Sequence, residues 1–458
     1  MIIAGIRRIH FVGIGGIGMS GIAELLINLR HVVSGSDVKR SELTDRLASM
    51  GARIAIGHDA INVGEADVVV VSSAIRPDNP ELVEARRRSV PVIPRAEMLA
   101  ELMRLRFGIA VAGAHGKTTT TSMIALVLER AGLDPTAVIG GRLSAFGSNA
   151  RLGHGKYMVA EADESDGSFL KLSPTIAVIT NIDYEHLETY GSFERLQDAF
   201  VEFANKVPFY GVVVACADDD ALRSVLPSIS RPVVTYGLDA LDSQLTATEL
   251  ELGPFAATAV VARRGVRMGV LRLHVPGRHN VANALAAVGV GFELDVPFER
   301  IAAALEQFRG ADRRFQPLGE ERGVLVIDDY GHHPTEIAAV VAAARGLKRR
   351  LIVVFQPHRF SRTQHLLDRF GPSFSGADEV VLTDIYPAGE DPISGVTLEA
   401  LARSMRATTT VPMHVVRALD EVPAAVVARV KSGDVVVTLG AGSIGGVGPR
   451  ILAELRRS

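Results

Sequence analysis

The residues of this chain that are best suited to chemistry lie in a glycine-rich stretch, FGIAVAGAHGKTTTT, at residues 107–121. An apolar run there breaks at Gly113 and Gly116, which allow a tight turn whose N–H groups point inward. Lys117 can reach the terminal phosphates of a nucleotide, and Thr118 can offer its hydroxyl to Mg²⁺. The stretch predicts a nucleoside triphosphate site; a tight strand-to-helix turn with an incidental lysine is the alternative.

The motif has the shorter form Gly-x-x-Gly-Lys-Thr, because Val111 stands where the full phosphate-loop pattern has a glycine. Only seven lysines stand among the 49 basic residues. A chain that carries its positive charge mainly as arginine has kept a lysine at a position where a compact point charge is needed. This choice of residue favours the nucleotide interpretation.

Two polar clusters follow the loop, each at the expected end of a strand. Residues 157–166, YMVAEADESD, place Glu161 at the end of an apolar run, and residues 175–190 contain a polar stretch with His186. Carboxylates at the carboxyl ends of strands beside a phosphate loop are where an α/β fold holds Mg²⁺. The alternatives are an exposed acidic loop for the first cluster and a structural role for His186.

An earlier glycine turn has the pattern of a dinucleotide-binding unit. A short apolar run at residues 8–12 leads into Gly-x-Gly-x-x-Gly at residues 13–18, and Asp37 follows about twenty positions later, where a Rossmann unit places its ribose ligand. Taken alone, this predicts NAD. A second copy of the pattern at residues 440–445 weakens that prediction, and a nucleotide-sugar diphosphate fits the first turn as well as NAD does.

Polar residues also gather after two strands that we expect near residues 324–327 and 351–355. The sequence DDYGHHP follows the first at residues 328–334, and QPHRFSR follows the second at residues 356–362. Two arginines and three histidines there favour recognition of carboxylate and phosphate oxygens. Zinc is the alternative for the histidines, but no cysteine accompanies them.

Asn280 and Asn283 follow a glycine turn and lie one helical turn apart. Their amides can donate to and accept from an adenine edge, although N-capping of a helix is the commoner role of asparagine there. Both interpretations of the pair stay open.

These motifs require α/β structure along the whole chain. Strands and helices alternate up to about residue 104, again around the phosphate loop, and most regularly after residue 321. We expect a Rossmann-like N-terminal domain at residues 1–104, a central P-loop ATPase-type domain at 105–320, and a C-terminal doubly wound Rossmann-like domain at 321–458. The length of 458 residues agrees with several domains.

The composition excludes several classes of protein. A net charge of −3 and 5% aromatic residues without tryptophan give no surplus for binding nucleic acid. No apolar run reaches the roughly 18 residues that span a bilayer. The single Cys216 forms no internal disulfide, and the sequence shows no signal leader. We expect a cytoplasmic globular protein, a monomer or weak dimer, that binds neither nucleic acid nor membrane.

Taken together, the motifs resemble those of the Mur ligase family of ATP-dependent amide-bond-forming enzymes. The similarity runs from His10 to about Gly446. It rests on HFVGIGGIGMSGIAE at residues 10–24, GAHGKTTT at 113–120, EADESD at 161–166, DYGHHPTE at 329–336 and QPHRFSRT at 356–363.

The resemblance implies ATP and Mg²⁺ as cofactors, with UDP-N-acetylmuramate and L-alanine as substrates. The implied nucleotide-binding residues are Gly113, Ala114, His115, Gly116, Lys117, Thr118, Thr119, His279, Asn283, Arg314 and Asp329. The implied metal ligands are Thr118, Glu161 and His186. The implied catalytic residues are Lys117, Glu161, His186, His332, Arg359 and Arg362. The implied substrate-binding residues are Gly15, Gly16, Ile17, Gly18, Ser36, Asp37, Ser73, Tyr330 and His358.

The reaction implied by the resemblance converts the muramoyl carboxylate to an acyl phosphate, which an amine then attacks. Lys206 lies where several family members carry a carbamoylated lysine and others have a different residue. A ligase that recycles a whole tripeptide would share these domains. A dehydrogenase leaves the phosphate loop unexplained, and a nucleotide switch without ligase activity needs neither the sugar domain nor the arginine and histidine cluster.

Overall fold

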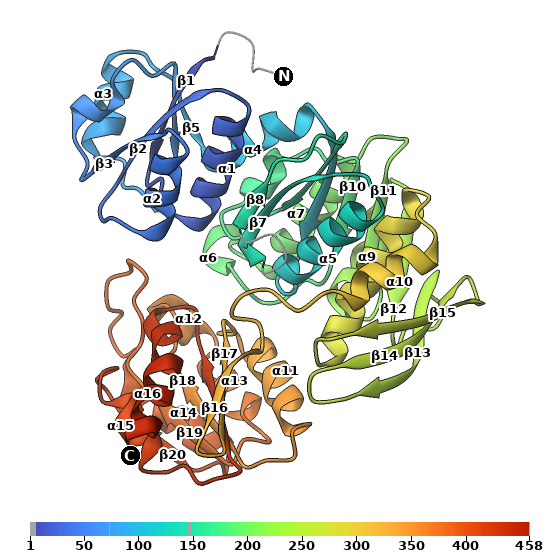
Figure 1. Cartoon of the computed structure of the whole chain (residues 1–458), viewed down its shortest axis with the longest axis vertical. Helices are drawn as coiled ribbons and strands as arrows, with labels where there is room; N and C mark the ends of the chain where they lie inside the picture. The colour runs from blue at the N-terminus through green and yellow to red at the C-terminus, as the bar shows by residue number, and fades with distance from the viewer. Residues whose placement is uncertain (1–5, 73, 144–147, 458) are drawn as a thin grey trace. The chain divides into compact units, whose positions relative to one another are not determined.

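The computed structural model describes residues 6–72, 74–143 and 148–457 of the chain. Its residues form two compact units (Figure 1). The first contains residues Met1–Glu249, Ala259–Arg272 and Asn280–Arg309, and the second contains Leu250–Thr258, Leu273–His279 and Gly310–Ser458. Among the helices that the structure describes, none is long and apolar enough to cross a membrane.

The first compact unit begins with a five-stranded parallel sheet in the order β3-β2-β1-β4-β5. Its strands are β1 (Arg8–Val12), β2 (Val32–Asp37), β3 (Arg53–Ile56), β4 (Val68–Val71) and β5 (Val92–Pro94). Its helices are α1 (Ile17–Asn28), α2 (Glu42–Ser49), η1 (Ala60–Val63), α3 (Pro80–Arg87) and α4 (Arg95–Arg104). The sequence analysis missed β3, which is short, partly exposed and begins with an arginine.

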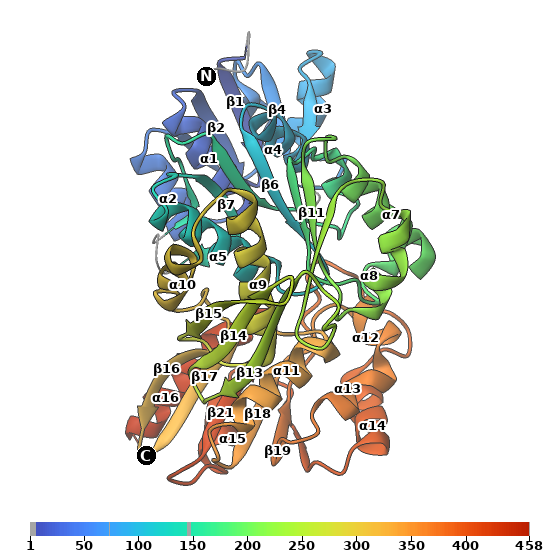
Figure 2. The same ribbon diagram turned by 90° about the vertical axis from the view of Figure 1, so that its right-hand side faces the viewer.

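The phosphate-loop motif lies on a ten-stranded sheet in the order β15-β14-β13-β12-β11-β10-β6-β9-β7-β8. The strands are β6 (Phe107–Ala112), β7 (Thr136–Leu143), β8 (Ser148–Arg151), β9 (Tyr157–Glu161), β10 (Ile176–Ile179), β11 (Val212–Cys216), β12 (Val233–Gly237), β13 (Leu245–Leu252), β14 (Ala257–Arg263) and β15 (Val266–Leu273). The helices are α5 (Lys117–Arg130), η2 (Ser168–Lys171), α6 (Leu187–Tyr190), α7 (Phe193–Asn205), α8 (Asp220–Val225), η3 (Leu226–Ser228), α9 (Arg278–Glu293) and α10 (Phe298–Glu306). Figure 2 shows α5 and α7 on opposite sides of the central strands.

Strand β6 lies between β9 and β10 and is parallel to both. Ala112 pairs with Ile179, and Val111 pairs with Glu161, so the three strands end at the same edge of the sheet. This register brings the loops that follow β6, β9 and β10 together.

The next strand, β11, ends at the buried Cys216, and burial raises the pKa of its thiol to about 11.

The second compact unit contains a six-stranded sheet in the order β16-β17-β21-β18-β19-β20. Its strands are β16 (Gln316–Glu321), β17 (Val324–Asp329), β18 (Leu351–Phe355), β19 (Glu379–Leu382), β20 (Met413–Val415) and β21 (Val435–Leu439). Its helices are α11 (Pro334–Arg345), α12 (Phe360–His365), α13 (Leu367–Ser373), α14 (Leu398–Thr408), α15 (Val422–Val427), η4 (Ser443–Gly446) and α16 (Val447–Arg457).

Strand β18 is buried on both faces of this second sheet, as a central strand of a doubly wound fold is. Val353 and Phe355 belong to the apolar core on one face of the sheet, and Ile352 and Val354 belong to the core on the other face. A strand buried on both faces has a continuous apolar sequence, which explains why its position was predictable.

The antiparallel edge strand β16 was not predicted. The domain boundaries near residues 104 and 320 remain predictions.

Candidate active site

The phosphate loop is shaped by two glycines with left-handed backbone angles. Gly113 has φ 135° and Gly116 has φ 82°. A Cβ atom on Gly113 would lie 2.0 Å from the hydroxyl of Thr180, and one on Gly116 would lie 2.6 Å from Oδ1 of Asn283. Both positions therefore require glycine for its backbone freedom and for its lack of a side chain.

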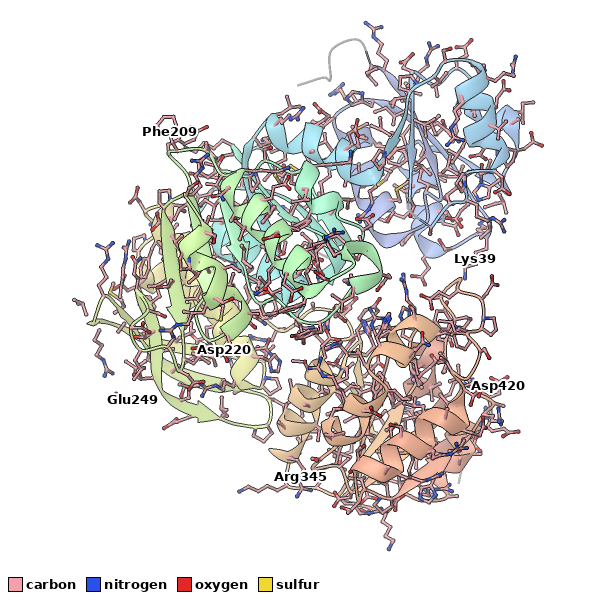
Figure 3. The ribbon with its side chains drawn as sticks, turned by 180° about the vertical axis from the view of Figure 1, so that it is seen from behind. Lys39, Phe209, Asp220, Glu249, Arg345 and Asp420 are labelled. Atoms are coloured by element: carbon pink, nitrogen blue, oxygen red, sulfur yellow. The ribbon has the colours of Figure 1, made fainter. Side chains whose placement is uncertain are left out.

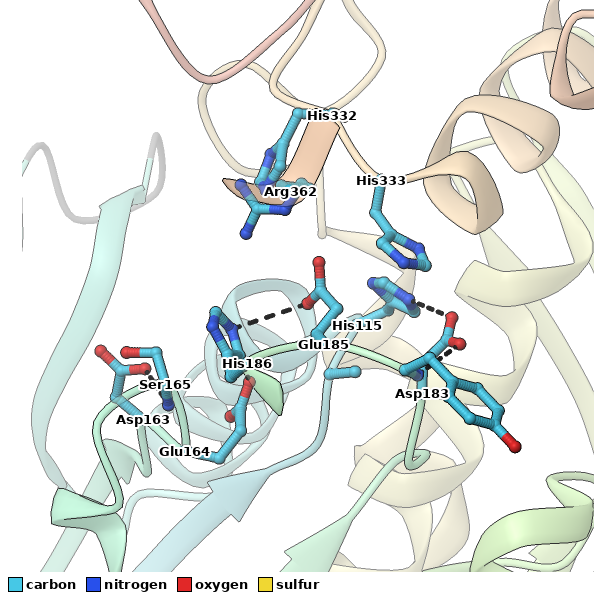
Figure 4. A network of polar contacts seen from close by, with 12 residues as sticks. His115, Asp163, Glu164, Ser165, Asp183, Glu185, His186, His332, His333 and Arg362 are labelled. Atoms are coloured by element: carbon cyan, nitrogen blue, oxygen red, sulfur yellow. Dashed lines mark hydrogen bonds and ion pairs between the residues drawn. The ribbon is translucent and has the colours of Figure 1, made fainter. Parts of the chain in front are cut away.

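The end of β10 fixes the conformation of this loop through His115. The side-chain amide of Asn181 accepts the His115 N–H at 2.8 Å and donates to the His115 carbonyl at 3.0 Å. Thr180 donates its hydroxyl to the same carbonyl at 2.6 Å. The imidazole Nε2 of His115 lies 2.9 Å from a carboxylate oxygen of Asp183 (Figure 4). These hydrogen bonds hold the loop in place.

Lys117 folds back over the loop and points toward the acidic cluster. Its Nζ donates to the carbonyls of Gly113 and Ala114 at 2.7 and 3.3 Å and to Glu164 Oε1 at 2.8 Å. Burial lowers the pKa of Lys117, but the negative charges of Glu164 and its acidic neighbours outweigh that effect and raise the pKa. The lysine therefore stays charged at neutral pH.

Glu164, Glu185 and His186 each offer a ligand atom, and these atoms lie within 4.8 Å of one another (Figure 4). His186 Nε2 lies 3.8 Å from a carboxylate oxygen of each glutamate. Burial raises the pKa of Glu164, and its Oε2 atom is buried with no hydrogen-bond partner among the residues that the structure describes. A buried carboxylate oxygen in this state suits a bound cation.

From the sequence, the carboxylates after both strands were expected at one edge of the sheet, but only Glu161 was predicted as a metal ligand; Glu164 and Glu185 were given no individual role. In the structure Glu161 is the last residue of β9, and the group around His186 consists of the other two glutamates. Both lie in the motifs that were singled out, but their sequence spacing alone does not show which carboxylates converge. The role of Glu161 as a ligand remains a prediction, as does that of Thr118, the second residue of α5.

Asn283 lies on α9 and contacts the phosphate loop. Its Oδ1 atom is packed against Gly116, and its amide donates to Asn280 Oδ1 at 3.4 Å. Asn280 and Asn283 are both buried. His279 belongs to the second compact unit, so contact of His279 and Asn283 with one adenine remains a prediction.

The N-terminal glycine turn is held by the end of β2. The N–H groups of Gly13 and Ile14 donate to the carbonyl of Ser36 at 2.9 and 3.0 Å, and the Gly15 N–H donates to Asp37 at 2.8 Å. Asp37 was expected to contact a ribose; in this structure its carboxylate contacts the turn itself. Gly16 is the N-cap residue of α1, which begins at Ile17.

Ser36, a predicted substrate contact, is fully buried in this structure. Its hydroxyl donates to Glu81 at 2.6 Å and lies 3.0 Å from His58 Nδ1. Contact of Ser36 with a substrate remains a prediction. Ser73 lies outside the described residues.

In the second compact unit, the predicted substrate residues gather around His358. Its Nδ1 accepts a hydrogen bond from Arg362 at 3.1 Å, and its ring centre lies 5.3 Å from that of His332. Burial, followed by the charges of His332 and Arg362, lowers the pKa of His358 to about 3. Because Arg362 can only donate, neutral His358 carries its proton on Nε2 and can donate from that atom.

Arg359 directly follows His358 and has an unusual backbone conformation, with φ 70° and ψ 140°. Such angles are costly for a residue with a side chain and are concentrated at functional sites. Its guanidinium lies 3.8 Å from Glu390, which also accepts hydrogen bonds from the N–H and hydroxyl of Ser361. Tyr386 stacks on His358 at 5.6 Å. The sequence analysis identified neither Glu390 nor Tyr386, because both lie on a loop without a recognised motif.

Asp329 and Arg314, expected to contact the nucleotide, also form contacts within this unit. Asp329 is buried and accepts the N–H groups of Phe315 and Gly331, both at 2.6 Å. Burial raises its pKa to about 6 despite the opposing charge of Arg314. Arg314 pairs with Glu336 at 3.2 Å, and its guanidinium lies 5.4 Å from the ring centre of Tyr330. Their contacts with a nucleotide remain predictions.

Lys206 and the second glycine pattern have structural contacts. Lys206 donates its Nζ to the carbonyl of Leu170 and pairs with Glu202 at 3.1 Å. Carbamoylation of Lys206 remains a prediction.

In the second glycine pattern, Arg313 donates to the carbonyl of Gly440 at 2.7 Å, and a Cβ atom on Gly445 would lie 2.6 Å from the Arg313 guanidinium carbon.

The fold and the phosphate-loop site define an α/β protein of the P-loop nucleotide-binding class. Three family models match the chain along most of its length: the Mur ligase family catalytic domain at residues 8–107, the Mur ligase middle domain at 111–291, and the Mur ligase glutamate ligase domain at 313–442. The chain belongs to the Mur ligase family. The predicted fold class and family are thereby confirmed.

Two relatives and two solved structures illustrate the similarity. The chain is 55% identical over 454 residues to the UDP-N-acetylmuramate--L-alanine ligase of Geotalea daltonii, with 99% of each chain covered. It is 55% identical over 456 residues to the enzyme of that name from Geobacter sulfurreducens, covering 99% of this chain and 98% of the relative. The UDP-N-acetylmuramate-alanine ligase structure from Thermotoga maritima matches with a TM-score of 0.83 at 32% identity, covering 98% and 99% of the two chains. A murein peptide ligase from Psychrobacter arcticus matches with a TM-score of 0.74 at 25% identity over 98% of each.

Proposed function

We propose that this protein is an ATP-dependent ligase that joins L-alanine to the muramoyl carboxylate of UDP-N-acetylmuramate and releases ADP and phosphate. This is the first peptide step in the synthesis of a peptidoglycan precursor. One observation carries the proposal. The chain is 55% identical, over nearly the full length of both chains, to relatives that are named UDP-N-acetylmuramate--L-alanine ligase.

The proposed chemistry has two steps. A carboxylate does not react with an amine at neutral pH because its oxygen is a poor leaving group. ATP therefore transfers its terminal phosphoryl group to the carboxylate, which forms an acyl phosphate and ADP. The amine of L-alanine then attacks the carbonyl carbon; the C–N bond forms, and the C–O bond to phosphate breaks with its electron pair leaving on the phosphate.

The central domain supplies the positive charge that the first step requires. Lys117 and the inward N–H groups of the loop would bind the ATP phosphates. A Mg²⁺ ion would be held by Glu164, Glu185 and His186, with Glu161 and Thr118 as further candidates, and it would neutralise charge on the phosphate oxygens. The buried Glu164 Oε2 atom, which no described protein group satisfies, supports this assignment.

The other residues of the site would divide between nucleotide and substrate. We assign Ala114, His115, Thr119, Asn283, His279, Arg314 and Asp329 to ATP, and Gly15, Gly16, Ile17, Gly18, Ser36, Asp37 and Ser73 to the uridine diphosphate sugar. Tyr330, His332, His358, Arg359 and Arg362 would receive the amino acid and the muramoyl group. The corresponding domains would be 1–104, 105–320 and 321–458. We expect a cytoplasmic enzyme that acts as a monomer or weak dimer.

The test of this function is turnover with isotopically labelled substrate. If the carboxylate is activated as an acyl phosphate, ¹⁸O in the muramoyl carboxylate should appear as one labelled oxygen in the released phosphate. ATP consumption should require UDP-N-acetylmuramate and L-alanine together. Unlabelled phosphate would contradict the acyl-phosphate mechanism, and preference for a tripeptide over L-alanine would favour a recycling ligase.

A further inference from the structure

The second glycine pattern of the chain, at residues 440–445, packs against two loops of the C-terminal sheet. A Cβ atom on Gly442 would lie 2.5 Å from Cγ of Tyr386. One on Gly440, whose φ is 145°, would lie 2.7 Å from the carbonyl oxygen of Gln356. Side chains at these two positions would displace their neighbours. The pattern therefore allows the loop that contains Tyr386 to approach the residues after β18.

Residues 386–390 form this loop, which follows β19 and is bound to the backbone around His358. The Tyr386 N–H donates to the carbonyl of Pro357 at 2.8 Å, and the Tyr386 carbonyl accepts the Arg359 N–H at 2.8 Å. The Tyr386 ring stacks on that of His358. The loop thus fixes the chain on both sides of His358.

Glu390, at the end of the same loop, holds the first turn of α12. The first N–H groups of a helix need acceptors, and the N-cap of α12 is Arg359, whose side chain has only donors. Glu390 supplies the acceptor from outside the helix. One carboxylate oxygen accepts the Ser361 N–H at 3.0 Å, and the other accepts the Ser361 hydroxyl at 2.6 Å.

This turn begins at the residue with the most unfavourable backbone of the site. Arg359 has φ 70° and ψ 140°, and a residue with a side chain keeps such angles only where surrounding contacts impose them. The contacts here are the Tyr386 carbonyl at its N–H and the Glu390 carboxylate two residues further along. Glu390 therefore helps to impose the direction in which the Arg359 side chain leaves the backbone.

The same carboxylate faces the guanidinium of Arg359 without binding it. Nη1 of Arg359 lies 3.8 Å from Glu390 Oε1, which is longer than a hydrogen bond. The two side chains are 42% and 25% exposed, so solvent screens the pair and it adds little stability. The guanidinium spends no donor on Glu390 and can donate to another carboxylate.

We propose that Glu390 is a positioning residue for the amino-acid substrate. Its hydrogen bonds to Ser361 hold Arg359 in the conformation from which the guanidinium binds the carboxylate of the amino acid. The inference rests on the proposed function, in which Arg359 receives that substrate. An arginine that is fixed before the substrate arrives loses less conformational entropy on binding, so the benefit appears in the affinity for the amino acid.

Steady-state kinetics of the full-length protein test this assignment. We expect Glu390→Ala to raise the KM for L-alanine by about tenfold, with the KM values for ATP and UDP-N-acetylmuramate little changed. Glu390→Gln keeps an acceptor for the Ser361 N–H and should recover most of that loss. An unchanged KM for L-alanine in Glu390→Ala, or an equal rise for all three substrates, would overturn the proposal. So would a Glu390→Gln variant as impaired as Glu390→Ala, because the carboxylate would then act by its charge.

A second background shows whether Glu390 acts through Arg359. In Arg359→Lys the rigid guanidinium fork is gone, so the effect of Glu390→Ala on the KM for L-alanine should be at least about threefold smaller than in the wild type. The same effect in both backgrounds would show that Glu390 acts elsewhere and would contradict the proposal.

Glu321→Ala is the matched control. Glu321 is exposed to a similar degree, 29%, and pairs with Arg456 at 2.7 Å. It lies opposite Val324, at the other end of β17 from Asp329, and its loss should leave the KM for L-alanine unchanged. Urea titrations would show whether the variants differ in stability. A wild-type protein that does not consume L-alanine would contradict the proposed function itself, whereas normal turnover with an unaffected Glu390→Ala would contradict only this inference.

Discussion

Lys117 and Glu164 form an ion pair at the phosphate loop, with Nζ and Oε1 2.8 Å apart. Replacement of Lys117 by alanine leaves the buried Glu164 without its counter-charge and removes the group that would meet the terminal phosphate. We expect kcat/KM to fall by about a hundredfold or more in Lys117→Ala, with the fold intact by circular dichroism. The matched control is Lys171→Ala, which removes an exposed lysine paired with Glu97, and it should retain normal turnover. Near-normal turnover of Lys117→Ala would contradict the assignment.

Asn181 allows a second test at the scale of single residues. It binds both the N–H and the carbonyl of His115, so it preforms the loop before a nucleotide arrives. Asn181→Asp keeps the acceptor but replaces the donor with a charge that repels the carbonyl. We expect the KM for ATP to rise by about fivefold to tenfold, with the KM for UDP-N-acetylmuramate little changed.

The control for this variant is Asn205→Asp, in which a partly exposed asparagine that bonds to Ser228 and Ser230 is changed in the same way. It should alter stability without altering the KM for ATP. An equal change of KM in both variants would show that Asn181 acts through general stability.

Lys117 and the two glycines were predictable because one local stretch of sequence contains both the turn and the charge. Glu164, Glu185 and Asn181 were not, because their roles depend on β9 and β10 flanking β6 in one register. Local patterns identify the loop, and the pairing of distant strands and helices determines its partners.

At the scale of elements, a buried carboxylate on α3, that of Glu81, bonds to the N-terminal sheet in addition to the apolar packing of the helix. Burial alone would raise the pKa of Glu81, but hydrogen bonds from His10, Ser36 and Asn62 outweigh it and lower the pKa from 4.5 to about 2. The ionised carboxylate therefore stabilises the fold above about pH 4.5, and this contribution is lost as the pH falls from about 4.5 toward 2.

We expect Glu81→Gln to unfold at lower denaturant concentration than the wild type at pH 7, with the difference narrowing below pH 4.5. Urea titrations at a series of pH values would measure both effects. A constant difference down to pH 2.5 would show that Glu81 does not titrate as inferred.

Arg359 and Arg362, which we assign to the amino acid, lie at the N-cap and in the first turn of α12, the helix that follows β18. Arg362→Ala should raise the KM for L-alanine by about tenfold or more, since it removes a charge-assisted hydrogen bond to a carboxylate. The control is Arg345→Ala, at the surface end of α11 (Figure 3), where the arginine pairs only weakly with Asp378 at 3.2 Å and should not affect the KM. Equal KM values for L-alanine in the two variants would contradict the assignment of Arg362 to the substrate site.

For the whole molecule, the class of fold and the order of its sheets along the chain followed from the alternation of apolar runs and helices. The parts of the fold that were missed are edge strands such as β3 and β16, which are partly exposed and lack a continuous apolar run. The extension of the central sheet by β13, β14 and β15 also had no signal among the motifs. Buried strands were predictable from sequence because both of their faces require apolar residues, and edge strands carry a weaker pattern.

The burial of Cys216 makes this chain suited to site-specific labelling. Its thiol, the only one in the sequence, is inert at neutral pH because its pKa is raised to about 11. Cysteines introduced at exposed positions would therefore react with a maleimide dye in preference to Cys216. Cysteines could replace Asp220 in one compact unit and Asp420 in the other (Figure 3) and carry a donor dye and an acceptor dye. The efficiency of energy transfer between the dyes would then report any change in the distance between the two units at each ligand-binding step.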